Sequence, residues 1–189
     1  MVTVNVEFWS GGSAGSPTKT NASTYRYRTD DDPDTIDNTN PCVIPDTGLN
    51  YSFWRHIALN WSGTFDEISN FRLFTDGTLF SGLGTSGEVQ RGNRDSGDQG
   101  VPEASYEPAS GTPGTSGDDL AANHPYFSGQ TTPVANLANA TSGSPITLDS
   151  TTYTTDGSSN ALCDQVVIDT DASSGTKSSE TYTFLFDVI

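Results

Sequence analysis

Apolar and polar residues alternate with a period of two at both ends of the chain. Residues 2–9 place three valines and a phenylalanine on one face and mainly polar side chains on the other. Residues 180–189 place Tyr182, Phe184 and Phe186 on one face. A period of two is that of a β-strand whose two faces meet different surroundings. Both segments are therefore predicted to be strands.

Valine, threonine and aromatic residues, which favour strands, are concentrated in several further runs. Within the apolar block 51–80, residues 54–60 fit either a strand or a short helical turn, and the aromatic enrichment favours the strand. Asp76-Gly77 is typical of a two-residue hairpin turn between Phe74 and the apolar residues that follow. Further strands are predicted at 23–29, 146–148, 151–155 and 161–169.

The pattern changes between Gly84 and Pro145. These 62 residues hold 10 glycines and 6 prolines but only 8 apolar residues larger than alanine. Such a segment buries too little surface to offset a chain entropy of roughly 1–2 kcal/mol per residue. Either its few aromatic residues hold it on its own domain or neighbouring chains hold it, and we favour the neighbouring chains.

No amphipathic helix longer than two turns is predicted anywhere. Residues 1–83 and 146–189 are therefore expected to form one all-β domain together, with 84–145 as an extended loop or insertion. The expected fold is an antiparallel β-sandwich of about eight strands, similar to a jelly roll.

Charge narrows the range of functions. The chain has 189 residues, with 24 acidic against 8 basic ones and a formal net charge of −16. This charge repels phosphate backbones and anionic lipid, so no nucleic-acid and no membrane partner is expected. The N-terminus alternates like a strand and shows no signal-peptide pattern, so we expect assembly inside a cell.

Acidic residues after Thr29 invite comparison with a Ca²⁺ site. Asp30, Asp32 and Asp34 occupy alternate positions, like the first ligands of an EF-hand loop. The sixth position is Thr35, where that loop needs glycine, and the twelfth is not glutamate, so the EF-hand pattern fails. A solvated acidic loop is the favoured interpretation, and an irregular Ca²⁺ site is the alternative.

The two cysteines and two histidines show no local metal-binding spacing. Cys42 and Cys163 are too far apart in sequence for a zinc knuckle or a redox pair, and free thiols are favoured over a disulfide. His56 is expected to pack in the core, and His124 has no evident partner. Since nucleophile-elbow and phosphate-loop motifs are also absent from the sequence, we expect no cofactor and no enzymatic activity.

Two side-chain types keep other functions open. Trp9, Trp54 and Trp61 would form a stacking platform in a carbohydrate-binding or adhesive module, but most rings are needed for the core. Carboxylates on or beside strands would serve an acidic glycosidase, although nothing separates them from ordinary sheet-surface acids. These carboxylates belong to Glu7, Asp66, Glu67 and Glu180.

Two segments resemble small β-sandwich structural proteins of tailed viruses. They are residues 61–73, with the sequence WSGTFDEISNFRL followed by Asp76-Gly77, and residues 178–184. The resemblance covers part of the chain and implies a capsid decoration or tail protein of a bacteriophage virion, assembled in the host cytoplasm. Such proteins are present in many copies, contact copies of themselves and other virion proteins, and carry no catalytic residues.

A homo-oligomeric virion structural protein is therefore the expected function. Its contacts would involve the 84–145 segment and pairing of sheet edges through residues 2–9 or 180–189. The alternative is a carbohydrate-binding or adhesive β-sandwich module whose partner is a surface glycan.

Overall fold

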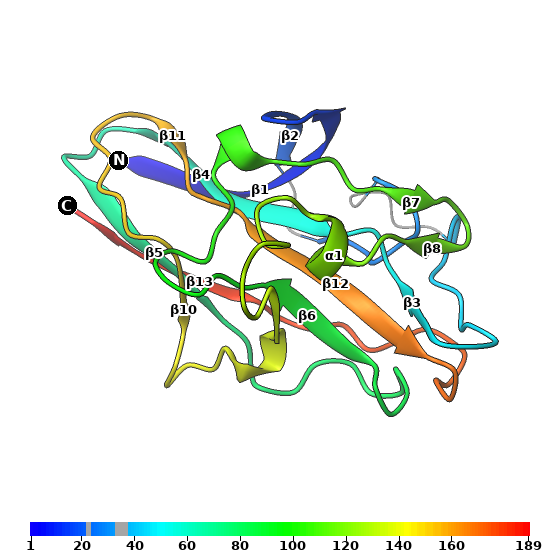
Figure 1. The fold of residues 1–189 in the computed structure, drawn as a ribbon. Coiled ribbons are helices and arrows are strands. Elements are labelled where there is room, and N and C mark those ends of the chain that lie inside the picture. The colour runs from blue at the N-terminus through cyan, green and yellow to red at the C-terminus, as the bar shows by residue number, and fades with distance from the viewer. Residues whose placement is uncertain (22–23, 33–37) are drawn as a thin grey trace.

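The computed structural model describes residues 1–21, 24–32 and 38–189. Its strands form two facing antiparallel sheets, which confirms the predicted all-β sandwich (Figure 1). The jelly-roll connectivity stays a prediction. The large sheet has the order β2-β1-β4-β12-β6-β9, with β11 paired to β4 and β3 paired to β12. The small sheet has the order β10-β5-β13, and β7 pairs with β8 in a separate hairpin.

The element bounds show how the sheets draw on distant parts of the chain. The large sheet contains β1 (Val2–Ser13), β2 (Ser16–Asn21), β3 (Leu49–Tyr51), β4 (Arg55–Gly63), β6 (Glu88–Gly92), β9 (Val134–Asn136), β11 (Gly157–Ser158) and β12 (Leu162–Asp169). The small sheet contains β5 (Ile68–Phe74), β10 (Ile146–Asp149) and β13 (Thr183–Val188). The remaining elements are β7 (Gly111–Thr112), β8 (Ser116–Gly117), the one-turn helix α1 (Leu120–Asn123) and the 3-10 turns η1 (Glu103–Ser105) and η2 (Leu137–Asn139).

Strand register sorts the side chains of the large sheet onto two faces. Phe8 of β1 lies opposite Ile57 of β4, and both pack into the core that faces the small sheet. Trp9 lies opposite His56, one residue further on, and points to the other face. The period of two read from residues 2–9 is thus the period of burial.

Aromatic stacking joins the two sheets. Trp61 of β4 stacks on Phe71 of β5 with ring centroids 4.8 Å apart, and both side chains are at most 1 % exposed. Residues 54–60, for which a helical turn was the alternative, begin with Trp54 outside any helix or strand and continue as strand β4. A strand places Ile57, Leu59 and Trp61 on one face, where they meet the small sheet.

Residues 93–133 form a third layer on the outer face of the large sheet (Figure 1). Val101, Tyr106, Leu120 and Phe127 from this layer are at most 1 % exposed and pack on outward-facing residues of β4 and β12. The 84–145 segment also supplies β6 and β9 to the large sheet. Its few large side chains therefore pack on its own domain, which is the alternative that we did not favour.

Three local predictions need correction. Residues 24–28 form no strand, and residue 23 lies outside the described residues. Here the buried guanidinium of Arg55 takes the place of a neighbouring strand. It donates to three carbonyl oxygens of this segment, those of Arg26, Arg28 and Asp30, at 3.2, 3.5 and 2.8 Å.

Asp76-Gly77 forms a turn but no hairpin. Gly77 has a φ of 88°, and the Thr78 N–H donates to the Asp76 carboxylate at 2.8 Å. The strand before the turn ends because Thr75 bonds to the Ala140 carbonyl instead of to the residues after the turn. Of residues 151–155, only Tyr153 pairs, in a single bridge to Ile68.

Candidate functional site

The three tryptophans lie in the interior and form no surface platform. Trp9, Trp54 and Trp61 are 2, 1 and 1 % exposed. Their indole N–H groups donate to the Glu7 carboxylate at 2.7 Å and to the Glu107 and Thr155 carbonyls at 3.0 Å each. Because neither ring face nor N–H group is open to a ligand, the prediction of glycan stacking on these residues is wrong.

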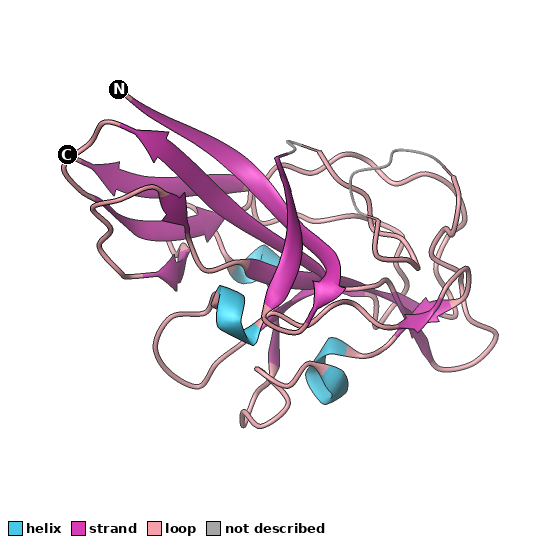
Figure 2. Ribbon diagram, turned by 90° about the horizontal axis from the view of Figure 1, so that it is seen from above, coloured by secondary structure: helices cyan, strands magenta, loops and turns pink. Residues whose placement is uncertain are grey.

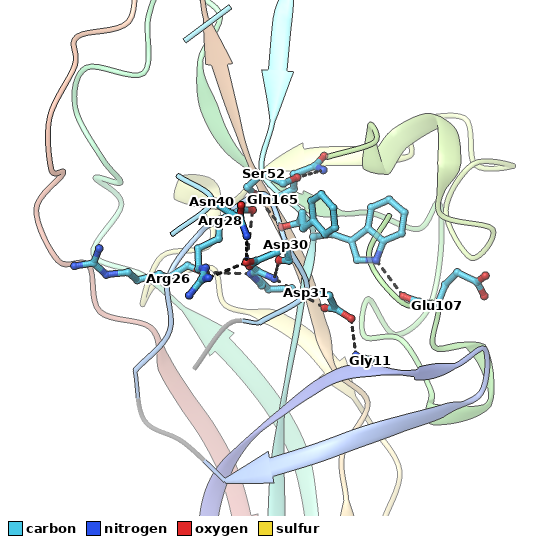
Figure 3. Close-up of polar contacts among 12 residues, drawn as sticks. Gly11, Arg26, Arg28, Asp30, Asp31, Asn40, Ser52, Glu107 and Gln165 are labelled. Carbon is cyan, nitrogen blue, oxygen red and sulfur yellow. Dashed lines mark hydrogen bonds and ion pairs between the residues drawn. The ribbon is translucent and has the colours of Figure 1, made fainter. Parts of the chain in front are cut away.

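One of the three aspartates proposed as Ca²⁺ ligands, Asp30, binds an arginine side chain of the protein. The Asp30 Oδ2 atom accepts hydrogen bonds from Arg28 Nη2 and Asn40 Nδ2, both at 2.7 Å (Figure 3). A guanidinium at this distance competes with a metal ion for the same oxygen. Asp34 lies outside the described residues, and Asp32 belongs to the same loop as Asp30.

The four carboxylates named as glycosidase candidates lie in different environments. Glu7 is 4 % exposed and accepts from the Trp9 indole and, at 3.0 Å, from the Ser158 hydroxyl. Asp66 and Glu67 are exposed at the start of β5. Glu180 accepts from the backbone N–H of Phe80 at 3.2 Å.

A buried carboxylate that sequence reasoning missed lies between the sheets. Asp164 of β12 is 0 % exposed and accepts from the hydroxyls of Tyr27 at 2.5 Å and Tyr25 at 3.1 Å. The Tyr182 hydroxyl lies 2.6 Å from that of Tyr27. Burial raises the pKa of Asp164 to about 6, against the opposing effects of these hydrogen bonds and of Arg55.

A cleft of about 960 Å³ opens in front of these tyrosines. Its wall combines the inner face of β1 with the segments 24–28 and 172–182. Aromatic rings line it, including those of Tyr25, Tyr27, Phe80 and Tyr182. Its volume lies near the upper end of the range typical of small-molecule sites, about 300–1,000 Å³.

The small sheet leaves one edge of β13 unpaired. β13 pairs with β5 on one side, and in the described ranges no backbone group pairs with its other side. The strand contains neither proline nor lysine. At the end of the strand the side chains become open to solvent, with Val188, its last residue, 44 % and Ile189 78 % exposed. β13 does contain Asp187 and an irregularity in its register with β5 between Leu185 and Asp187. A six-residue edge strand without proline or lysine is still a template for the addition of another strand.

The first half of β1 lies beside this edge, so both chain ends meet on one side of the sandwich (Figure 2). Within residues 1–21, 24–32 and 38–189, β2 pairs with β1 only from Glu7 onward, so there Val2–Val6 has β4 as its strand partner. Inward-facing residues of the two strands share one cluster but remain only partly buried. We call the unpaired edges of Val2–Val6 and Thr183–Val188, with the seam between them, the open side.

The other sheet edges carry features that block strand addition. β2 contains Pro17 and Lys19, and β9 is only three residues long. The edge of β10 is covered, because the Thr147 and Leu148 carbonyls accept hydrogen bonds from residues 99 and 100. Proline, lysine and short length are three of the devices by which natural sheets prevent edge pairing. The open side lacks them, which makes it the strongest surface candidate.

The structure also brings together three residues that the sequence left apart. His56, His124 and Cys163 form one buried group on the outer face of the large sheet. Cys42 packs on the other side of that sheet, and both thiols are free, as expected. His56 is in the core, as expected, but the proximity of His124 arises from the layer packed on the sheet, which no local spacing could reveal.

Comparison with known proteins adds no relative. No family model, curated protein or solved structure matches this chain. Among the described residues, no helix has the length and apolar character needed to cross a bilayer.

Proposed function

We propose that this chain is a structural subunit of a virion, present in many copies and joined to neighbouring copies through its open side. The observation that carries this proposal is the contrast between the unpaired apolar edge of β13 and the blocked edges elsewhere. The resemblance of residues 61–73 and 178–184 to structural proteins of tailed viruses supplies the virion context.

The occupant of the open side is a strand from a second copy of the chain. Backbone N–H and C=O groups on the free side of β13 would pair with that strand, as in β-augmentation. The contact would also cover Val188 and Ile189 and complete the burial of Phe184 and Phe186. Full burial of one such apolar side chain contributes about 1.5–3 kcal/mol.

Charge sets the conditions for this association. Each copy carries a formal charge of −16, so two copies repel one another at low ionic strength. Salt at about 0.15 M shortens the range of this repulsion to roughly 8 Å, whereas the apolar contact persists. Association should therefore strengthen as salt is added, opposite to what a contact made of ion pairs would show.

Leu185→Lys tests the edge. Leu185 pairs with Arg72 of β5 on the solvent-facing side of the small sheet, and Thr147 pairs with the same arginine from the other edge. Thr147→Lys therefore adds the same charge to the same face at the covered edge and is the matched control. Sedimentation velocity over a range of protein and salt concentrations should show oligomers for the native chain and Thr147→Lys, but mainly monomers for Leu185→Lys.

The outcomes separate the two parts of the proposal. A native chain that stays monomeric at all concentrations and salt levels would refute pairing between copies. If Leu185→Lys forms the same oligomers as the native chain, the contact between copies lies on a surface other than the open side. Immunogold labelling of purified virus particles tests the virion context, and particles without label would refute it.

The aromatic cleft favours a second candidate, a carbohydrate-binding module with its site between the sheets. Tyrosine and phenylalanine rings such as Phe80 stack on the apolar faces of sugars. Titration with oligosaccharides, followed by isothermal calorimetry, should give a heat signal that Phe80→Ala removes. Phe65→Ala, at a partly buried aromatic that packs against the core outside the cleft, is the control. Absence of heat with every class of oligosaccharide would exclude this candidate.

A further inference from the structure

Cross-strand register places a thiol beside an imidazole on the outer face of the large sheet. Cys163 of β12 and His56 of β4 are direct partners in the antiparallel ladder. His124 follows helix α1 and reaches the same point from the layer above. The Nε2 atoms of the two histidines are 3.2 Å apart, and the ligand atoms of all three residues lie within 4.8 Å of one another.

These separations suit a single metal ion. Two nitrogens that bind one zinc ion at about 2.0–2.1 Å in tetrahedral geometry lie roughly 3.3 Å apart. The observed 3.2 Å matches this value. A nitrogen and a sulfur on the same ion would be about 3.6 Å apart, and the ligand atoms of the three residues lie within 4.8 Å of one another, so a side-chain adjustment of Cys163 brings its sulfur into range.

Aromatic side chains surround the three buried residues. His56, His124 and Cys163 are 2, 0 and 1 % exposed. The rings of Trp54 and Phe127 lie 5.4 and 5.0 Å from that of His124, centroid to centroid. Burial lowers the pKa of both imidazoles, that of His124 to about 4.

The metal-free arrangement has its own hydrogen bond. Nδ1 of His124 accepts from the backbone N–H of Tyr126 at 3.3 Å, so the proton of this imidazole lies on Nε2 and faces His56. Metal binding at Nε2 transfers that proton to Nδ1, breaks the long Tyr126 bond and releases the thiol proton of Cys163 to solvent. Without metal, His56 and His124 thus form a hydrogen-bonded pair, and the experiment must distinguish this pair from a metal site.

We propose that His56, His124 and Cys163 bind a zinc ion that fastens the outer layer to the large sheet. Two imidazole nitrogens and a thiolate are ligands for zinc and for copper(I), whereas Ca²⁺ and Mg²⁺ prefer oxygen. The site is independent of the open side, since it lies on the outer face beneath residues 93–133. The metal would link strands β4 and β12 to the segment that carries His124.

Cobalt(II) tests this site because its bond to a thiolate absorbs in the near ultraviolet. The full chain is unfolded in the presence of a chelator, which removes bound metal, and is then refolded with cobalt(II). Refolding with the ion lets cobalt reach a site that is buried in the folded chain. We expect a thiolate-to-cobalt band, its loss when zinc is added, and one ion per chain by native mass spectrometry. Zinc should also raise the midpoint of thermal unfolding.

Cys163→Ser and His124→Gln should lose the band, and Cys42→Ser is the matched control because its thiol lies on the other side of the sheet. Circular dichroism of each variant without metal shows that it is folded. A folded chain with no band and no added mass would overturn the proposal in favour of the histidine pair. An equal band in Cys163→Ser would also overturn it, and binding of copper(I) but not zinc would overturn the choice of metal.

Discussion

Replacing Phe127 with alanine should detach the outer layer from the large sheet. The Phe127 ring is 0 % exposed and fills the space above Gly92, where an added Cβ would come within 2.2 Å of the ring. A phenylalanine buries ~150–250 Å², which at ~25 cal/mol per Å² amounts to about 4–6 kcal/mol. Measured truncations of this kind cost about 3–5 kcal/mol, which is a large part of the ~5–15 kcal/mol that stabilises a domain.

Two measurements on the isolated chain check this expectation. Urea unfolding should give a free energy lower by about 3–5 kcal/mol for Phe127→Ala, and limited proteolysis with mass readout should show faster cleavage between Gly84 and Pro145. Tyr126→Ala is the control, since Tyr126 is only partly buried and its ring faces Arg94. Tyr126→Ala should lower the free energy of unfolding by less than Phe127→Ala does, and it should leave the proteolytic cleavage pattern unchanged.

The native chain provides the result that would refute the reasoning. If protease cuts the isolated native chain between Gly84 and Pro145 as fast as it cuts Phe127→Ala, the layer is not held by its own contacts. Neighbouring subunits would then have to hold it, and the burial of Phe127 would contribute little to stability.

Three further predictions rest on single side chains. Gly92→Ala should destabilise the chain by about 1–3 kcal/mol through its clash with Phe127, and addition of Phe127→Leu should restore part of this loss in urea unfolding. Arg55→Lys should increase hydrogen–deuterium exchange in residues 24–32, because an ammonium group cannot serve three spread carbonyls; unchanged exchange would contradict this role. The folded pKa of Asp164, about 6, exceeds its ordinary value of 3.8, so its contribution of about 3 kcal/mol is fully present below pH 4 and is lost as the pH rises through 6. Urea unfolding with chelator should show that the free energy of unfolding falls less between pH 4 and 8 for Asp164→Asn than for the native chain. Parallel plots of this free energy against pH would argue against the raised pKa.

The parts of the fold that follow a local period could be predicted from the sequence. Strands 2–9, 161–169 and 180–189 agree with β1, β12 and β13 because alternation records which face each side chain buries. Residues 24–28, which belong to the strand predicted at 23–29, form no strand in the structure. The carbonyl groups of this segment accept hydrogen bonds from the Arg55 side chain of β4 instead of from a neighbouring strand. The sequence pattern of the segment itself does not indicate this.

Features that depend on packing between distant segments could not be predicted. Val101, Tyr106 and Phe127 looked too few to order their segment, yet each lies over an outward-facing residue of the large sheet. The cluster of His56, His124 and Cys163 likewise requires the register of β4 with β12 and the placement of α1. Sequence spacing carries no information on either.

The order of strands in the small sheet constrains when the chain can fold during its synthesis. β5 lies between β10 and β13, and both partners are translated long after it. Ribosomes add about 5–20 residues per second, so the 72 residues from Phe74 to Ile146 take roughly 4–14 s. During this interval Phe71 and Leu73 belong to a strand without neighbours, and such strands are the usual starting points of aggregation. Chaperone dependence in the cell should therefore be set by β5, even though its side chains are among the best buried in the finished molecule.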